Sequence, residues 1–435
     1  MSPGAATLLV ALLDGVRVGH VEQTHTGRLR FTYDDAWRHR ANAYPLSLSL
    51  PLIAAEHDHK PTEAFLWGLL PDNALTLDRY GRAFGVSPRN PAALLVHMGA
   101  DCAGAVQFAP PDRVAELTAP HGNRGVRWLT SREIAEELRS VRETGIPDAS
   151  ALRSLGQFSL AGAQPKIALL EEGRRWGRPR GRTPTNRILK PPSGAFPGFV
   201  ENEHFCLELA GSLNLGAVSS RVRRFSTEVA IVVKRFDRLK RGRVYTRIHQ
   251  EDCCQARAIP PSRKYENEGG PGIADIITLL REASLDADDD IARFLRATAL
   301  NWVIAATDAH AKNYALLHGH RGVRLAPFYD ILSFLPYADD ALHRVKLAMS
   351  IGGEYSVRRV NRMRWEKLAK DNGLRIAYVL DTVRDVLAQL PLAVDSATES
   401  SAGTGIDLKV IRRLAARVLQ RTRECSALLA PRARE

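Results

Sequence analysis

Two segments in the C-terminal half carry side chains whose types suit phosphoryl transfer. Residues 306–313 read ATDAHAKN, and residues 326–330 read APFYD. Together they supply two carboxylates, Asp308 and Asp330, and one amide, Asn313. In such chemistry one aspartate orients and deprotonates the attacking hydroxyl group, while an asparagine and a second aspartate hold Mg²⁺ against the phosphates. The two segments therefore contain the parts of a phosphoryl-transfer site.

The spacing of these residues adds to their types. Asn313 follows Asp308 by five positions, which is the D-x-x-x-x-N order of a protein-kinase catalytic loop, and Asp330 comes after it in place of the metal-binding aspartate. A single match of this kind is weak, because polar loops are common. His310 is more often a structural residue than a catalyst, and Asp308 and His310 with a distant aspartate also suit a metal hydrolase.

Two upstream segments could bind the phosphates of a nucleotide. Residues 159–166 read SLAGAQPK, and the small residues at 161–163 would let backbone N–H groups approach phosphates, with Lys166 as a counter-charge. A simple turn between two strands explains the same residues. Residues 186–190, NRILK, predict a strand that ends in Lys190, where a kinase places the lysine that contacts the α- and β-phosphates.

A further strand could supply the adenine site. Residues 229–233 are rich in valine and isoleucine and end at Lys234, which is followed by Arg235, Phe236 and Asp237. A strand that stops at a short connecting segment can offer backbone hydrogen bonds to adenine. Each of the five segments is weak evidence alone, but their order along the chain favours an ATP-dependent kinase.

The hydrophobic patterns indicate which elements position these residues. Residues 7–33 alternate as in a β-meander with a hairpin turn at Asp14 and Gly15, and Leu46, Leu48, Leu50 and Leu52 predict another half-buried strand. A helical pattern runs from residue 62 to about 95. Residues 109–127 resemble a linker, and a strand-helix-strand unit follows to about residue 240.

The remaining residues predict a helical block. Residues 291–303 form one apolar helical face, residues 395–404 predict a loop, and residues 408–418 predict a last amphipathic helix with an arginine-rich outer side. These patterns predict an α+β protein divided into residues 1–110, residues 111–245 and a mainly helical block of residues 246–435.

Composition limits the classes of protein that fit. The 435 residues are 45% hydrophobic and 25% charged, which is enough for two to three domains and argues against a disordered chain. The net charge of +13 suits contact with nucleic acid, acidic proteins or ATP, and a surface simply covered by arginine explains the same excess. Five cysteines without metal-like spacing, no signal peptide and no membrane-length apolar run predict a cytoplasmic protein with reduced thiols.

Motifs along most of the chain, from about residue 8 to residue 420, resemble the HipA family of serine/threonine kinase toxins in bacterial HipBA-type toxin–antitoxin modules. The motifs read PLSLSLP at 45–51, LLPDN at 69–73, GADCAGA at 99–105, SLAGAQ at 159–164, VENE at 200–203, RFDR at 235–238, QED at 250–252, KYE at 264–266, GGPG at 269–272, ATDAHAKN at 306–313 and PFYD at 327–330.

The resemblance implies a kinase-like, two-lobed fold with a β-rich N-terminal subdomain and an all-helical C-terminal lobe. It implies that Asp308 is the catalytic base, that His310 and Lys312 complete the catalytic loop, and that Asn313 and Asp330 bind Mg²⁺. ATP would be bound by Ala161, Gly162, Ala163, Gln164, Lys166, Lys190, Lys234, Arg235, Phe236, Asp237, His310 and Asn313, with Asp237 near the ribose.

The resemblance also implies regulation by autophosphorylation. The sequence departs from the family pattern at two positions. A serine beside the phosphate-binding loop is autophosphorylated in the family, which ejects the loop, and Ser159 stands at that position. The family loop commonly reads Gln-Glu-Lys, but Pro165 stands here in place of the glutamate and removes one backbone N–H. Lys234 stands where the hinge often carries glutamate. Neither departure involves the catalytic carboxylates, so the resemblance implies an active enzyme.

Partners follow from the resemblance as well. It implies a HipB-like helix-turn-helix antitoxin that binds operator DNA, and an aminoacyl-tRNA synthetase, of the glutamyl-tRNA synthetase type, as the protein substrate. Two alternatives remain: a co-repressor that acts with a DNA-binding antitoxin, and the metal hydrolase. The Asp308, Asn313 and Asp330 set argues against the first, and the lack of a Cys/His cluster or an H-E-x-x-H pattern argues against the second.

Overall fold

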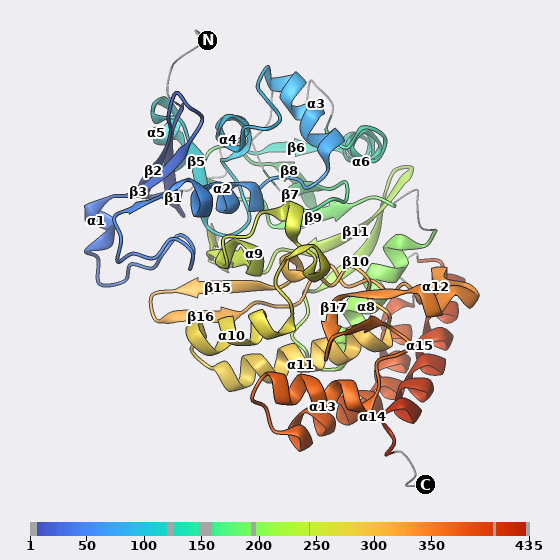
Figure 1. Ribbon diagram of the computed structural model, residues 1–435. Coiled ribbons are helices and arrows are strands. Elements are labelled where there is room, and N and C mark those ends of the chain that lie inside the picture. Colours follow the sequence, from blue (N-terminus) through green and yellow to red (C-terminus); the bar gives the residue numbers. More distant parts are fainter. Residues whose placement is uncertain are drawn as a thin grey trace. The chain divides into compact units, whose positions relative to one another are not determined.

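A computed structural model describes residues 7–119, 125–147, 159, 161–192, 197–242, 244–402 and 406–431 (Figure 1). The chain forms two compact units. The first contains residues 1–193, 224–262 and 316–323, and the second contains residues 194–223, 263–315 and 324–435. Neither unit is continuous in sequence, whereas we predicted three consecutive parts. The mixture of helices and sheets confirms the α+β class.

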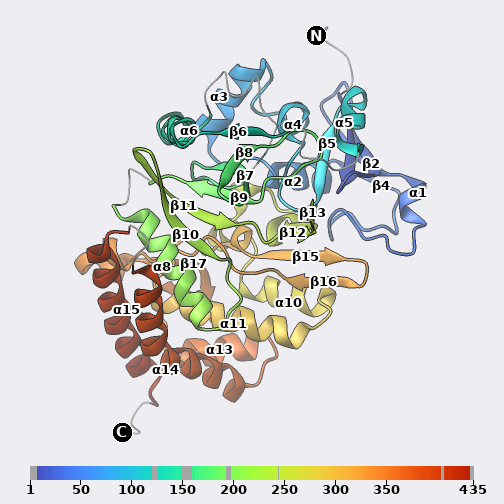
Figure 2. The ribbon, with the colours of Figure 1, turned by 180° about the vertical axis from the view of Figure 1, so that it is seen from behind.

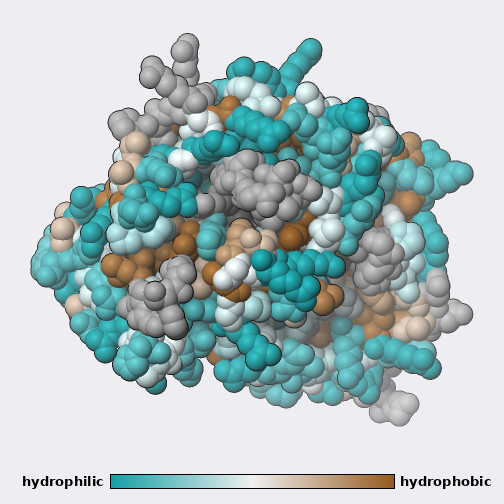
Figure 3. All heavy atoms as spheres, turned by 90° about the horizontal axis from the view of Figure 1, so that it is seen from above, coloured by the Kyte–Doolittle hydropathy of each residue, from teal (hydrophilic) through white to brown (hydrophobic). Residues whose placement is uncertain are grey.

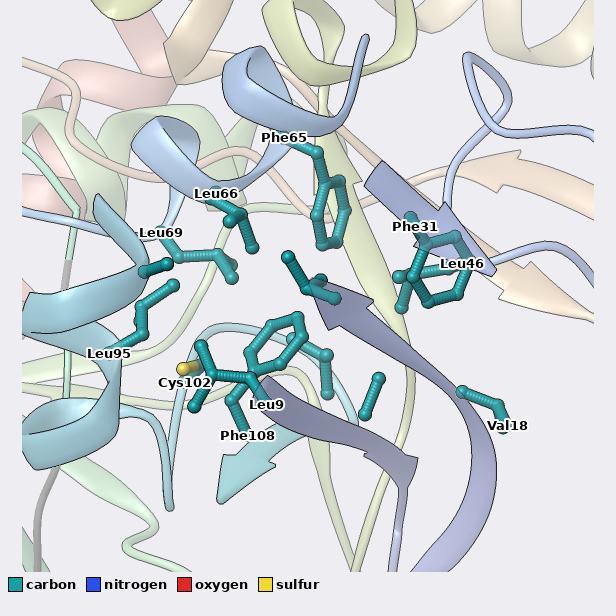
Figure 4. Packing of buried hydrophobic residues seen from close by; sticks show 14 of the residues in the cluster. Leu9, Val18, Phe31, Leu46, Phe65, Leu66, Leu69, Leu95, Cys102 and Phe108 are labelled. Carbon is teal, nitrogen blue, oxygen red and sulfur yellow. The ribbon is translucent and has the colours of Figure 1, made fainter. Parts of the chain in front are cut away.

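The first unit begins with a five-stranded antiparallel sheet in the order β4-β3-β2-β1-β5. Asp14 and Gly15, with φ of 45° and 78°, form the predicted hairpin turn between its first two strands. Phe65, Leu66 and Leu69 point from α2 and its C-terminal end toward Leu9 and Phe108 of the sheet (Figure 4). The strands are β1 (Thr7–Leu13), β2 (Val16–Gln23), β3 (Leu29–Tyr33), β4 (Glu56–His57) and β5 (Val106–Ala109), and the helices around them are α1 (Asp35–Arg38), α2 (His59–Gly68), α3 (Ala74–Phe84), α4 (Pro91–Met98) and α5 (Val114–Thr118).

The predicted strand at residues 46–52 is wrong. This segment forms turns closed by an isolated bridge between Ser47 and Leu50. Leu46 and Leu50 are buried, but so is Ser47, whereas Leu48 and Leu52 are only partly buried. In place of a neighbouring strand, Glu251 accepts hydrogen bonds from this segment. Its carboxylate accepts the hydroxyl group of Ser47 and, at 2.8 Å, the backbone N–H of Leu48. A buried carboxylate thus satisfies the polar groups that a sheet would otherwise pair.

The second sheet of the first unit has six strands in the order β10-β11-β9-β7-β8-β6. Helix α6 packs Ile134, Leu138 and Val141 into the core beneath it. Antiparallel pairing sets Lys190 opposite Ile231 and Lys234 opposite Arg187. The elements are β6 (Arg127–Leu129), α6 (Ser131–Thr144), β7 (Ile167–Glu172), β8 (Arg175–Arg178), β9 (Arg187–Lys190), β10 (Ser220–Phe225) and β11 (Glu228–Lys234).

Short elements complete the first unit. One small sheet pairs β12 with β13, and another has the order β14-β15-β16, which is why residues 316–323 belong to this unit. The elements are β12 (Arg238–Arg241), β13 (Val244–Arg247), β14 (Gln250–Asp252), α9 (Cys253–Ala256), β15 (Ala315–Gly319), β16 (Gly322–Leu325), and the 3₁₀ turns η1 (Pro111–Arg113) and η3 (Pro261–Arg263).

The second unit is mostly helical, with α14 and α15 side by side (Figures 1 and 2). The predicted apolar face of residues 291–303 lies on α11, where Phe294, Leu295 and Trp302 are fully buried, and the predicted last helix is α15. The elements are α8 (Phe199–Ser212), η4 (Glu266–Glu268), α10 (Ile273–Ala283), α11 (Ala287–Val303), η5 (Ala311–Asn313), α12 (Leu335–Ala338), η6 (Asp339–Arg344), β17 (Lys346–Ile351), β18 (Glu354–Ser356), α13 (Arg362–Asp371), α14 (Ile376–Ser401) and α15 (Leu408–Leu429).

Two predictions for this part of the chain need correction. Residues 246–435 are not all helical, because strands β14 to β18 lie among them. Residues 395–401 continue α14 instead of forming a loop, and residues 403 and 404 lie outside the described residues. The hydroxyl groups of Thr398 and Ser401 donate to the carbonyls of Val394 and Ala397, at 2.7 and 2.8 Å. Such bonds let serine and threonine continue a helix whose inner face is buried.

Two further expectations from the sequence concern the cysteines and membrane-spanning helices. All five cysteines are free and buried. Among the residues that the structure describes, no helix has both the length and the apolar character needed to cross a membrane. On the face drawn in Figure 3, hydrophilic side chains surround small, separate hydrophobic patches.

Candidate active site

The loop that carries Asp308 begins where α11 ends in the second unit. Ala305 adopts a left-handed conformation with φ of 53°, and the N–H of Ala306 returns to the carbonyl of Asn301 at 2.8 Å. A left-handed residue after the last turn is a common way to end a helix, although alanine is unusual there. The chain leaves the helix abruptly at this point, and the side chain of Asp308 is 52% exposed.

The carboxylate of Asp308 is held through one of its two oxygens. Tyr265 donates its phenolic hydroxyl to Oδ1, and Nε2 of His310 lies 3.5 Å from the same oxygen. The side-chain amide of Asn313 donates to the backbone carbonyl of Asp308 at 2.6 Å, which fixes the loop. No described residue donates a hydrogen bond to Oδ2 of Asp308. One oxygen is therefore anchored, and the other can accept a proton.

The loop that carries Asp330 is fixed by its neighbours. The N–H of Phe328 donates to Gly216 and its carbonyl accepts from Val218, at 3.0 and 2.9 Å, so this buried residue pairs like part of a strand. Two residues later, Asp330 has a φ of 58°. A non-glycine residue held at positive φ is strained, and such strain gathers at functional sites. The hydroxyl of Tyr329 donates to the carbonyl of Lys312 at 2.8 Å and ties the two loops together.

Asp308, Asn313 and Asp330 line one pocket, whose walls are largely apolar. The amide nitrogen of Asn313 is engaged, so its oxygen is the group left to bind a ligand. Oxygen ligands of this kind suit Mg²⁺, which usually binds one or two protein groups and completes its shell with water and phosphate oxygens. Among the described residues no group of three or more His, Cys, Asp or Glu side chains forms a metal site.

His310 and Lys312 are buried, with 3% and 6% exposure. The ring of His310 packs edge-on against Tyr265, with 4.9 Å between ring centroids. His310 thus supports the Asp308 loop from the protein interior.

The predicted phosphate-binding loop lies in the first unit. Gly162 has a φ of 104°, pairs with Pro71, and accepts the N–H of Asp72 at 3.2 Å. Lys166 folds back and donates its ammonium group to the carbonyl of Ala161 at 2.7 Å. Ala163 is exposed beside them.

Two observations fit this loop to a phosphate ligand. A Cβ atom at Gly162 would lie 2.7 Å from the lysine Nζ, which would have to move, and the φ of 104° favours glycine at this position. The side-chain nitrogen of Gln164 is buried, and no described residue accepts its hydrogen bond. An anion could take that bond.

Ser159 is fully buried. Its hydroxyl donates to the carbonyl of Leu69 at 2.6 Å, and its N–H donates to the carbonyl of Asp101 at 3.2 Å. Both partners belong to the N-terminal part of the same unit. In this arrangement the hydroxyl is inaccessible to any phosphoryl donor.

The other predicted nucleotide contacts lie on the six-stranded sheet. Lys190 is 5% exposed at the end of β9, and Lys234 is exposed at the end of β11. The N–H of Arg235 donates to the carbonyl of Asn186 at 3.1 Å, so the segment after β11 continues beside β9. Phe236 is half-buried.

The resemblance implies that Asp237 lies near the ribose, and in this structure its carboxylate is engaged within the protein. Its carboxylate is buried and accepts hydrogen bonds from Arg235, from the N–H of Gly104 at 2.7 Å, and from Gln250. Burial alone would raise the pKa of Asp237, but Arg235 and Arg238 outweigh burial and lower it. The side chains of Arg235 and Asp237 stabilise the unit internally, so only their backbone remains for a ligand.

The same cluster contains Asp101. Its carboxylate accepts from Arg238 at 2.8 Å, from Arg247 at 3.2 Å, and from the hydroxyl of Thr185 at 2.7 Å. Burial would raise the pKa of Asp101, but the charges of Arg238, Arg247 and Arg235 together hold it well below its usual value. Asp101 and Asp237 thus neutralise arginines that are themselves buried.

The structure brings the predicted site residues together in two groups. Asp308, His310, Lys312, Asn313 and Asp330 form one group in the second unit, and residues 159–166, 190 and 234–237 belong to the first. No role for Tyr265 was predicted from the sequence. The only available signal was its place in the KYE motif, because its contact with Asp308 joins residues 43 positions apart.

Known proteins resemble this chain along most of its length. A model of the HipA N-terminal domain matches residues 9–109, and a model of the HipA-like C-terminal domain matches residues 158–394. A protein of Sinorhizobium fredii named "Putative kinase Y4mE" is 34% identical over 417 residues, which are 94% of this chain and 96% of that protein. The serine/threonine-protein kinase toxin HipA of Shewanella oneidensis is 26% identical over 375 residues, which are 83% of this chain and 82% of the relative.

A solved structure also matches. It contains HipA of Shewanella oneidensis in complex with HipB and its operator DNA, and the match covers 97% of this chain and 98% of that HipA chain. The TM-score is 0.81 at 22% sequence identity. The two chains therefore share a fold, and the expected HipA-like, kinase-like fold is confirmed.

Proposed function

The chain belongs to the HipA family, and from this premise we propose that it transfers the γ-phosphoryl group of ATP to a serine or threonine hydroxyl of a protein. One observation carries the proposal: Asp308, with Oδ2 open, lines the same pocket as Asn313 and the strained Asp330. These are the base and the two metal-binding groups that phosphoryl transfer requires.

The chemistry assigns one task to each group. The acceptor hydroxyl donates its hydrogen bond to Oδ2 of Asp308 and passes its proton there as its oxygen bonds to phosphorus. The bond between the γ-phosphorus and the oxygen of ADP breaks, and ADP leaves with that electron pair. Asn313 and Asp330 would hold Mg²⁺, which neutralises phosphate charge when it is bound. Asn313 also fixes the backbone of Asp308.

The nucleotide would be bound by residues of the first unit. Backbone groups of residues 161–164, the side chain of Gln164, Lys166 and Lys190 suit the phosphates. The ammonium group of Lys166 donates to the carbonyl of Ala161, and it carries three N–H donors in all. Backbone groups of Lys234, Arg235 and Phe236 suit adenine.

Autophosphorylation of Ser159 would switch the enzyme off. The hydroxyl is fully buried against Leu69, so the segment must leave this site before phosphoryl transfer. A phosphoserine carries nearly two negative charges and cannot return to a buried site that offers it only a carbonyl oxygen. Phosphorylation would therefore trap the loop outside.

Incubation with radiolabelled ATP and Mg²⁺ tests the proposed reaction. Wild type should label itself and a protein in cell extract, whereas Asp308→Ala should label neither. Asp381→Ala is the matched control, because it removes an exposed carboxylate from α14 of the same unit. Equal labelling by wild type and Asp308→Ala would rule out Asp308 as the base. Mapping of the label onto a residue other than Ser159 would refute only the proposed autophosphorylation.

The family suggests a cellular role for this activity. We propose a toxin that is held inactive by a HipB-like helix-turn-helix antitoxin bound to operator DNA, since the related HipA was solved with HipB and its operator. An aminoacyl-tRNA synthetase, of the glutamyl-tRNA synthetase type, is the proposed substrate. Purified synthetases incubated with the enzyme and labelled ATP test this choice one by one. Label on an unrelated protein instead of any synthetase would contradict it.

The runner-up function is a co-repressor that acts through the antitoxin without phosphoryl transfer. The net charge of +13 favours contact with DNA. Expression in cells separates the two functions, because Asp308→Ala should lose toxicity only if toxicity comes from phosphoryl transfer. A variant as growth-inhibitory as wild type would favour the co-repressor.

A further inference from the structure

The hydroxyl group of Tyr265 contacts the carboxylate that the proposed reaction uses as its base. We propose that Tyr265 is a positioning residue, which fixes the orientation of Asp308 so that Oδ2 faces the acceptor hydroxyl. The inference rests on the proposed function, because it assigns a task within that reaction. Both residues belong to the second unit, so the contact lies inside one compact body.

A rigid turn holds Tyr265 in place. Its carbonyl accepts the N–H groups of Glu268 and Gly270, at 3.0 and 2.9 Å. A Cβ atom at Gly270 would lie 2.2 Å from the carbonyl oxygen of Arg263, so the chain can approach itself this closely only at a glycine. The backbone position of Tyr265 is therefore determined by the turn and does not depend on its contact with Asp308.

The next residue anchors the turn to the rest of the unit. The carboxylate of Glu266 accepts the N–H of Ser350 and, at 3.0 Å, its hydroxyl. Ser350 lies on β17, so a strand far along the chain secures the KYE segment. Because the segment is secured on both sides, the phenol presents its hydroxyl from a fixed support.

The hydrogen bond makes the two oxygens of Asp308 unequal. Oδ1 accepts the Tyr265 hydroxyl and lies 3.5 Å from Nε2 of His310, whereas Oδ2 accepts no hydrogen bond from a described residue. The outer torsion of an aspartate is broad and two-fold, so an exposed carboxylate can turn over many orientations. The tyrosine restricts this rotation, and one oxygen stays available for the proton.

Restricted rotation matters because proton transfer depends on alignment. A base must lie within hydrogen-bond reach of the proton that it abstracts, and small displacements at a reacting centre are costly. A competing explanation is that the phenol occupies the place of the acceptor hydroxyl and inhibits the enzyme. The geometry favours positioning, because the phenol shares Oδ1 with His310 and leaves Oδ2 open.

Tyr265→Phe tests the proposal, because it removes the hydroxyl and keeps the ring that packs against His310. We expect kcat to fall by about tenfold, the scale of one lost hydrogen bond to a charged group. KM for ATP and the melting temperature should stay unchanged. Tyr378→Phe is the matched control, because it removes a phenolic hydroxyl from α14 of the same unit.

A second variant separates the hydrogen bond from packing. Tyr265→His keeps an aromatic ring with an N–H donor, so it should recover part of the rate that Tyr265→Phe loses. A phenylalanine variant as fast as wild type, or faster, would overturn the proposal, and the faster result would indicate inhibition by the phenol. A loss of rate matched by losses in ATP affinity and melting temperature, without recovery in the histidine variant, would also overturn it.

The experiments distinguish a failure of the proposed kinase function from a failure of the positioning role of Tyr265. If wild-type protein shows no labelling that depends on Asp308, the proposed function fails, and the role of Tyr265 fails with it. If that labelling is present and Tyr265→Phe has no effect on kcat, only the positioning role fails.

Discussion

The hydroxyl group of Ser159 donates a 2.6 Å hydrogen bond to the carbonyl of Leu69, 90 positions earlier in the chain. The same N-terminal segment contacts the loop again at Gly162, which pairs with Pro71 and accepts the N–H of Asp72. The LLPDN segment therefore holds the start of the proposed phosphate-binding loop within the first unit. Through these contacts, the LLPDN segment restrains the position of a loop that is distant in sequence.

Substitution of Ser159 should separate the loss of a hydrogen bond from the addition of a charge. Ser159→Ala should lower the free energy of unfolding by about 1 kcal/mol and keep kinase activity, because one neutral hydrogen bond is lost. Ser159→Asp should abolish labelling of other proteins in extract and weaken ATP binding, because a carboxylate cannot remain in a fully buried site without a donor. Ser87→Asp, on an exposed turn, is the control for added charge. An active Ser159→Asp enzyme would show that the buried position is not needed for ATP binding.

Gly162→Ala should weaken ATP binding. The new Cβ would lie 2.7 Å from Nζ of Lys166, and alanine is strained at a φ of 104°. Strain of this kind costs about 1–3 kcal/mol, and in the bound loop we expect about a tenfold rise in the dissociation constant of ATP. Gly173→Ala is the control, since φ is +60° and no atom lies within 4 Å of its new Cβ. Fluorescence titration with a nucleotide analogue measures both. Equal affinity in the two variants would contradict a phosphate-binding role for this loop.

Asp101→Asn should strongly destabilise the first unit. The substitution leaves the buried Arg238 and Arg247 with one carboxylate fewer, and loss of one partner of a buried ion pair costs about 3–5 kcal/mol. Denaturant unfolding at neutral pH measures the change. Asp35→Asn removes an exposed carboxylate from the same unit and should change stability by less than about 0.5 kcal/mol. A small effect of Asp101→Asn would mean that the arginines find other partners.

Stability should fall in acid, and part of that fall should come from His249. Burial, together with the nearby His318, lowers the pKa of His249 to about 3 in the folded protein. The unfolded chain has the ordinary value of about 6.5, so it binds the proton first as pH falls. The stabilising contribution is thus complete above pH ~6.5 and is lost as pH falls toward 3, by up to about 1.4 kcal/mol per pH unit.

His249→Gln isolates this contribution. The variant should be less stable at pH 7, since it loses the ring N–H that donates from Nε2 to the carbonyl oxygen of Leu46 at 2.7 Å. Its stability should depend less on pH between about 6 and 4. His57, His97 and His204 also have lowered pKa values, and they act equally in both proteins. Unfolding curves at several pH values give the two slopes. Parallel slopes would show that the pKa of His249 does not differ between the folded and unfolded protein in this range.

The sequence allowed prediction of features that depend on near neighbours. The Asp14-Gly15 hairpin, the buried face of α11, and the common pocket of Asp308, Asn313 and Asp330 all follow from local spacing. Features that depend on distant residues could not be predicted. Residues 46–52 alternate like a strand, but Glu251, two hundred positions away, satisfies their polar groups.

The same limit applies to the surroundings of the site residues. Asp237 has the position of a ribose ligand in the motif, but Gly104 and Arg238 occupy its carboxylate. Tyr265 contacts Asp308 only because a glycine turn and the Glu266–Ser350 contact bring it there. Serine and threonine at residues 396–401 suggested a loop, and only the burial of Ala397 and Ser401 shows why the helix continues.

The chain passes from one unit to the other after residues 193, 223, 262, 315 and 323. No continuous stretch of the gene therefore encodes either unit alone. A premature stop codon within residues 194–323 would therefore leave both units incomplete, so truncation in this range cannot yield either unit intact.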